Sequence, residues 1–187
     1  MKFYYTTSAD PDTDQKKPTL SLGGFKSSSP TLNDENGNLF DEITPYTVTK
    51  NKNEYIGLML VNELGADKTN LQIWFEHPEG SYSKYQIAGV IPTTDGDGNP
   101  YIERIETRTS KPFYGDFEDA DVDNKYSLGN LADGGYLGIW IKRELLTDFI
   151  ETDICDVYEE DPTNSRLYVA KEKSTEDVIN IKLSWDD

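Results

Sequence analysis

The apolar residues of this chain recur mainly at every second position, which is the spacing of a half-buried β-strand. In residues 178–185 isoleucine, leucine and tryptophan alternate with polar or small residues. Residues 71–76 and 136–142 repeat the alternation, and residues 55–61 form a continuous apolar run of strand length. Such a run is typical of a strand buried on both faces. This periodicity favours a β-sheet protein over a helical bundle.

Two further segments, 85–91 and 101–108, have strand character, and we expect them to pair as a hairpin across the glycine-rich turn at 95–100. Residues 143–151 carry apolar side chains at a spacing compatible with one short amphipathic helix and also with irregular packing. No strand–helix–strand rhythm is present. We therefore predict a mainly β fold, an immunoglobulin-like antiparallel β-sandwich with at most one short helix.

The polar N-terminal region predicts a separate element. Residues 6–38 are dominated by Asp, Lys, Pro, Ser, Gly and Asn, so we expect little regular structure there. A chain of 187 residues is short for two full domains. We predict an extended N-terminal arm at residues 1–38, either disordered or packed along a neighbouring subunit, and one β-sandwich domain at residues 39–187.

The acidic composition limits the classes of partner. A formal charge of −17 repels phosphate backbones, so we expect no direct nucleic-acid binding. We favour solubility as the role of this charge over steering of a basic partner. No stretch has the length of a membrane span, so we expect a soluble chain with no membrane partner. Cys155 is the single cysteine, which excludes an internal disulfide and a cysteine-rich metal site.

One turn has the spacing of an EF-hand calcium loop. Positions one, three, five, nine and twelve are Asp95, Asp97, Asn99, Glu103 and Glu106. The sixth position, which needs glycine for its sharp bend, is Pro100, and the flanks have strand rather than helix character. We favour a plain hairpin turn and no cofactor, and keep calcium at Asp95, Asp97, Asn99 and Glu106 as a minority hypothesis. A second acidic run, Asp119, Asp121 and Asp123, we interpret as a solvated loop.

Catalytic signatures are weak. The single histidine, His77, precedes a proline in an apparent turn, and the motifs of nucleotide-binding, zinc and serine-nucleophile enzymes are missing. A divergent glycoside hydrolase would need two facing carboxylates. The candidates are Glu106, Asp116, Glu118 and Asp119. Because acidic residues are so common here, such pairs arise by chance, and we predict a protein with no catalytic residues that is not an enzyme.

The tyrosines offer an alternative function, a carbohydrate-binding module, because aromatic faces beside acidic and amide groups suit sugars. The candidates for such a platform are Tyr82, Tyr85, Tyr101, Tyr114, Tyr126 and Tyr136. We favour the other interpretation, in which these side chains line the edge of the core or a contact between subunits.

Two stretches resemble segments of immunoglobulin-like modules. Residues 55–62 followed by 70–76 resemble their strand–Asn–turn–strand pair, and residues 128–143 resemble their turn-then-strand segment, with Asp133-Gly134 where Pro-Gly is usual. The chain as a whole, with SLGGF at residues 21–25 leading into LFDEI at 39–43, resembles small virion structural proteins of tailed bacteriophages, particularly those of gut Bacteroidetes phages.

This resemblance implies a β-rich protein of the virion, present in several copies and without enzymatic activity. Its expected partners are other virion structural proteins and copies of itself. We expect a place in a neck or tail ring before one in capsid decoration. The contacts would come from the arm, from sheet edges and from tyrosine and tryptophan side chains.

Overall fold

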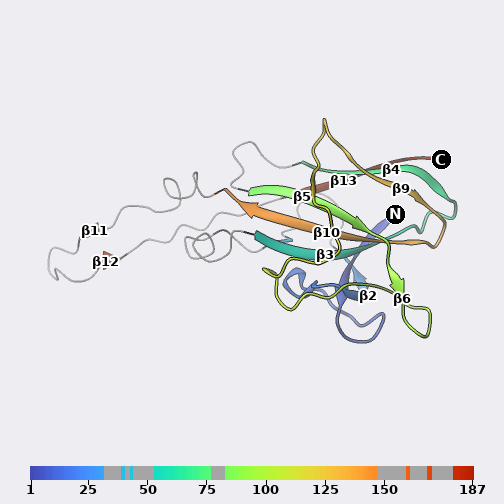
Figure 1. The fold of residues 1–187 in the computed structure, drawn as a ribbon, viewed down its shortest axis with the longest axis horizontal. Helices are drawn as coiled ribbons and strands as arrows, with labels where there is room; N and C mark the ends of the chain where they lie inside the picture. Colours follow the sequence, from blue (N-terminus) through green and yellow to red (C-terminus); the bar gives the residue numbers. More distant parts are fainter. Residues whose placement is uncertain are drawn as a thin grey trace.

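The fold is mainly β, with antiparallel sheets, as the two-residue period predicts (Figure 1). The computed structural model describes residues 1–31, 39–40, 43, 53–76, 83–146, 159–160, 168–169 and 179–187. His77, Tyr82 and Cys155 lie outside these residues. Within them, no helix is long and apolar enough to cross a membrane.

The main sheet has eight strands, and its centre is the continuous apolar run. β3 (Asn53–Val61) pairs along its length with β10 (Tyr136–Leu145), which in turn pairs with β5 (Ser83–Val90). The full order is β6-β7-β2-β1-β3-β10-β5-β8. The remaining members are β1 (Lys2–Thr7), β2 (Gly24–Pro30), β6 (Thr93–Thr94), β7 (Pro100–Ile102) and β8 (Glu118–Asp119).

A second sheet of three strands covers one face of the main sheet. Its middle strand, β4 (Lys68–Glu76), pairs with β13 (Asn180–Asp186) and with β9 (Tyr126–Leu131). Figure 1 shows these three strands together on one side of β3, β5 and β10. The smaller elements are a two-stranded pair, β11 (Glu159–Glu160) with β12 (Tyr168–Val169), and the 3-10 turn η1 (Pro18–Leu20).

Each face of the main sheet buries its own cluster of side chains, because successive residues of a strand point to opposite faces. The inner cluster, between the two sheets, contains Ile56, Leu58, Leu60, Leu71, Ile73, Phe75, Ile87, Ile139 and Ile141 among others. The outer cluster contains Tyr4, Tyr55, Met59, Val61, Ala88, Ile102, Ile105 and Trp140. Both faces of β3 are therefore buried, which explains its continuous apolar sequence.

The N-terminal region differs from the expected arm, because residues 2–7 and 24–30 form strands of the main sheet. β1 lies between β2 and β3 and pairs with both. Hydroxyl groups help to hold this region: the Thr6 N–H donates to Ser21 Oγ at 2.8 Å, and the Thr6 hydroxyl donates to the Gly57 carbonyl at 3.1 Å. The expected boundary at residue 38 lies outside the described residues.

Two finer predictions about the strands are wrong. β7 pairs with β6 and with β2 rather than forming a hairpin with β5, and the segment that follows Ile102 leaves the sheet. The helix expected from Arg143 onward is also corrected at its start, since β10 continues to Leu145. The rest of that segment, from residue 147 on, lies outside the described residues.

One end of the fold is braced by a buried asparagine, Asn62, which directly follows β3. Its Nδ2 donates to the carbonyls of Ala66, Leu131 and Ala132 at 2.9, 3.0 and 3.1 Å, and its Oδ1 accepts from the Leu64 N–H. A single side chain thereby ties the turn after β3 to the turn before β10, and so connects the two sheets.

Candidate functional site

The candidate site is built on residues 103–117, which cross the outer face of the main sheet. β1 pairs with β3 only from Val61 to Leu58, so the edge of β3 beyond that point is open to other segments. The Tyr55 N–H donates to the Arg108 carbonyl at 2.7 Å, and Ile105 is buried in the outer cluster. These contacts hold an irregular segment on the sheet.

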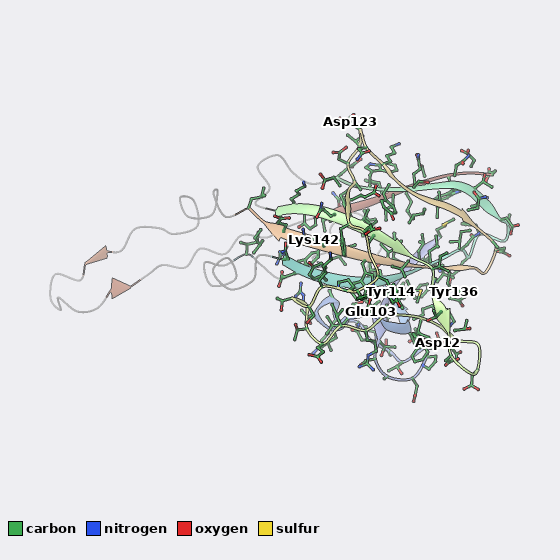
Figure 2. The ribbon with its side chains drawn as sticks, viewed as in Figure 1. Asp12, Glu103, Tyr114, Asp123, Tyr136 and Lys142 are labelled. Carbon is green, nitrogen blue, oxygen red and sulfur yellow. The ribbon has the colours of Figure 1, made fainter. Side chains whose placement is uncertain are left out.

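Two neighbouring aromatic residues project from this segment, and we call them the aromatic tip: Phe113, which is 82% exposed, and Tyr114, which is 62% exposed. Their rings meet edge to face, with centroids 5.0 Å apart. The carboxylate of Glu103 accepts hydrogen bonds from the N–H groups of both residues, at 2.8 Å and 3.0 Å (Figure 2). The tip is therefore held in place by its backbone while its side chains face solvent.

The same segment lines a pocket of about 440 Å³ on the outer face, which we call the outer pocket. β3, β5 and β10 supply its floor, and residues on either side of the aromatic tip supply its other wall. The lining residues are Asn53, Tyr55, Gln86, Lys111, Gly115, Asp116, Phe117 and Lys142. Polar and aromatic groups thus meet on one side of the sheet.

The polar groups of the outer pocket are partly fixed by one another. Lys142 Nζ donates to Gln86 Oε1 and to Glu144 Oε2, each at 2.8 Å. The Tyr55 ring packs against Phe117, with centroids 5.4 Å apart. Burial, and then the negative charge of Glu144, raise the pKa of Tyr55, so its hydroxyl stays protonated at neutral pH.

A second group of charges lies on the inner face and has a structural character. Arg143 is fully buried, and its guanidinium donates to the Glu54 carboxylate through Nε at 3.1 Å and also through Nη2. The Phe40 ring lies under two guanidinium groups, those of Arg143 and Arg108, at 4.8 and 5.3 Å. This group of charges was not predicted from the sequence, although Arg143 continues the alternation of Ile139 and Ile141.

The turn considered for calcium uses its carboxylate internally. Asp95 Oδ1 accepts from the N–H groups of Asp97 and Asn99 at 2.9 and 2.8 Å, and its Oδ2 accepts from Asn99 Nδ2 at 3.0 Å. The Asn99 side chain is the largest cause of the lowered pKa of Asp95. Glu103, at the ninth position of the loop pattern, instead holds the aromatic tip. Among the described residues, no three His, Cys, Asp or Glu side chains come close enough to hold a metal ion.

The other acidic candidates are dispersed. Asp119 forms an ion pair with Lys84 at 2.8 Å, the largest cause of its lowered pKa. Asp121 accepts from the N–H groups of Asp123 and Asn124, which closes a turn. Of the four carboxylates considered for hydrolysis, Asp116 alone lines the outer pocket.

The five candidate tyrosines that the structure describes do not form one platform; Tyr82 lies outside the described residues. Tyr85 is buried in the inner cluster, and Tyr126 packs against that cluster while its hydroxyl accepts from the Gly89 N–H at 3.1 Å. Tyr101 packs against Phe25, with ring centroids 5.6 Å apart. Tyr136 packs against the outer cluster, and Tyr114 belongs to the aromatic tip. Among the described residues, the tyrosine that lines the pocket is Tyr55, which was not one of the candidates from the sequence.

In comparisons with known proteins, no family model, no curated protein and no solved structure matches this chain.

Proposed function

We propose that this chain is a structural component of a phage particle that acts through protein–protein contacts in a multi-copy assembly. A neck or tail ring is the favoured location, before capsid decoration, and the partners are other virion structural proteins and further copies of the chain. The proposal follows the resemblance to virion proteins and assigns the chain no catalytic role. The observation that carries it is the aromatic tip.

The aromatic tip has the properties of an anchor for a partner. Aromatic side chains supply much of the binding energy at protein interfaces. Burying a side chain as exposed as Phe113 contributes about 1.5–3 kcal/mol. Because Glu103 already fixes the backbone of both tip residues, little conformational entropy of the backbone is lost when a partner covers them.

The sheet edges offer a second type of contact. The main sheet ends in the two-residue strands β6 and β8, which leave few backbone groups for a neighbour. The second sheet ends in longer strands, β9 and the seven-residue β13. Within the described residues β13 pairs on one side, with β4. A neighbouring chain could add a strand at this edge.

The finer fold class, an immunoglobulin-like sandwich, is part of the same proposal. It is supported by the two antiparallel layers and by Asn62, the asparagine of the strand–Asn–turn–strand segment, which links the turn after β3 to the turn before β10. The charge of −17 disfavours nucleic acid as a partner.

The test is cross-linking in virions assembled from the genome that encodes the chain. Lys111 is exposed and two residues from the aromatic tip, so an amine-reactive reagent should link it to a neighbouring structural protein or copy. Lys182, on the second sheet, is the reference position for the opposite side of the fold. Failure to find the chain in purified virions would overturn the proposal.

A matched pair of variants tests the tip itself. The double variant Phe113→Ser/Tyr114→Ser should lose incorporation into particles, whereas Ile91→Ser, which removes a side chain that is 84% exposed but outside the tip, should retain it. Equal incorporation of both variants would show that the tip is not the contact. Equal melting temperatures of the purified variants would exclude misfolding as the cause.

A further inference from the structure

We propose that the outer pocket binds one uncharged sugar unit, with the hydroxyl of Tyr55 as the central contact. This site uses other side chains than the assembly role, since its polar groups come from the strands of the main sheet and from Lys111 and Asp116 rather than from the aromatic tip. Its volume of about 440 Å³ lies within the range of small-molecule sites.

The Tyr55 hydroxyl is the first support. Tyr55 is 4% exposed, and its hydroxyl makes no hydrogen bond to any described residue. The hydroxyl oxygen is nevertheless not fully shielded from solvent. The exposed part of this side chain therefore includes the hydroxyl, and because Tyr55 lines the outer pocket we place the hydroxyl at the pocket wall. A hydroxyl with no partner in the described chain and with access to the pocket is free both to donate to a ligand and to accept from it.

The neighbouring groups provide both donors and acceptors, which sugar hydroxyls need because each can give and take a hydrogen bond. Lys142 uses two of its three N–H donors on Gln86 and Glu144, and the third is left for a ligand. Asp116 is an exposed acceptor on the opposite wall, and Asn53 adds an amide at the floor.

The balance of charge selects an uncharged ligand. Two lysines line the pocket, Lys111 and Lys142, and they are matched by the carboxylate of Asp116 in the lining and by that of Glu144, which is bound to Lys142. A phosphate or carboxylate ligand would meet as much repulsion as attraction there. The half-buried ring of Phe117, packed on Tyr55, supplies an apolar surface against which the C–H face of a sugar can pack.

The test uses the full chain and ligand-observed NMR. The probes are glucose, galactose, mannose and N-acetylglucosamine, each free and as the terminal unit of an immobilised oligosaccharide, which separates a free sugar from a glycan as the source. Inorganic phosphate and glucuronate are the charged comparisons. We expect a Kd of about 1 mM for at least one neutral sugar, so that binding is seen at sugar concentrations up to about 10 mM. This sugar should bind more strongly than either anion.

The variants identify the site. Tyr55→Phe should weaken binding about five-fold, which corresponds to the loss of one hydrogen bond of about 1 kcal/mol. It should leave the melting temperature unchanged, because this hydroxyl has no partner within the described chain. Asp116→Asn should also weaken binding, while the control Tyr101→Phe should not. The proposal is overturned if no neutral sugar binds, if the anions bind better, or if Tyr55→Phe binds like the unmodified chain.

Discussion

Replacing Asn62 by alanine should destabilise the fold strongly without touching the outer pocket. The side chain is fully buried, and its amide connects the turn after β3 with the segment between β9 and β10. Alanine removes the amide and leaves the carbonyl of Leu131 without this donor in a buried position. The loss of stability therefore includes the cost of keeping this carbonyl buried without a hydrogen-bond donor.

The magnitude can be worked from the contacts. The two N–H groups of Asn62 serve three carbonyls, and its oxygen accepts one N–H, so about three hydrogen bonds are lost. At about 1 kcal/mol each, the free energy of unfolding should fall by about 3 kcal/mol. For a typical urea dependence of about 2 kcal/mol per molar, the midpoint would move down by about 1.5 M.

Urea unfolding followed by tryptophan fluorescence measures this shift. The control is Asn130→Ala, since Asn130 is exposed and its side chain accepts a hydrogen bond from the Asn70 N–H at 3.2 Å. We expect this control to cost about 0.5 kcal/mol, as for ordinary surface changes. A loss below about 1 kcal/mol for Asn62→Ala, or equal losses for both variants, would refute the bracing role.

Three further outcomes are expected. The pKa of Glu63 is lowered, chiefly by the hydrogen bond from Tyr4, so its contribution to stability is present above its ordinary pKa of 4.5 and is lost as pH falls through the lowered value. Glu63→Gln should therefore be less stable than the unmodified chain at pH 7 and similar to it at the acid end; a difference in unfolding free energy that does not change with pH would contradict this. Gly138→Ala would place a Cβ 2.3 Å from Ile102 Cγ2, so calorimetry should show a loss of about 1–3 kcal/mol, partly recovered with Ile102→Ala. Glu103→Gln should speed hydrogen exchange at the two tip amides about ten-fold, for a loss of about 1.4 kcal/mol, and unchanged exchange would show that the carboxylate does not hold the tip.

The strands that could be predicted are those whose buried residues are apolar. β3, β4, β10 and β13 fall on the segments expected from the two-residue period. β2 could not be found in this way, because its buried positions include serine. Ser27 is fully buried, and its hydroxyl donates to the Gln15 carbonyl at 2.9 Å, so hydrogen bonding replaces the apolar signal.

The same reasoning explains the misassigned helix. Ile139, Ile141, Arg143 and Leu145 lie at alternate positions of β10 and are all buried. The charge of Arg143 interrupts the apolar alternation in the sequence, because a charged residue is normally expected at the surface. Arg143 can be buried only because it pairs with Glu54 on the neighbouring strand β3. Pairing between distant residues leaves no local periodicity, and the outer pocket was missed for the same reason: its lining comes from three strands and a loop.

The aromatic tip and the outer pocket share one segment but use different side chains, which makes the two proposals separable. The tip is held by Glu103, and the Tyr55 hydroxyl stands on β3 beneath the segment. Removing the tip aromatics should abolish assembly and spare sugar binding, while Tyr55→Phe should do the reverse. If both changes abolished both properties, segment 103–117 would have to act as one unit, and the partner and the sugar would compete for the same face.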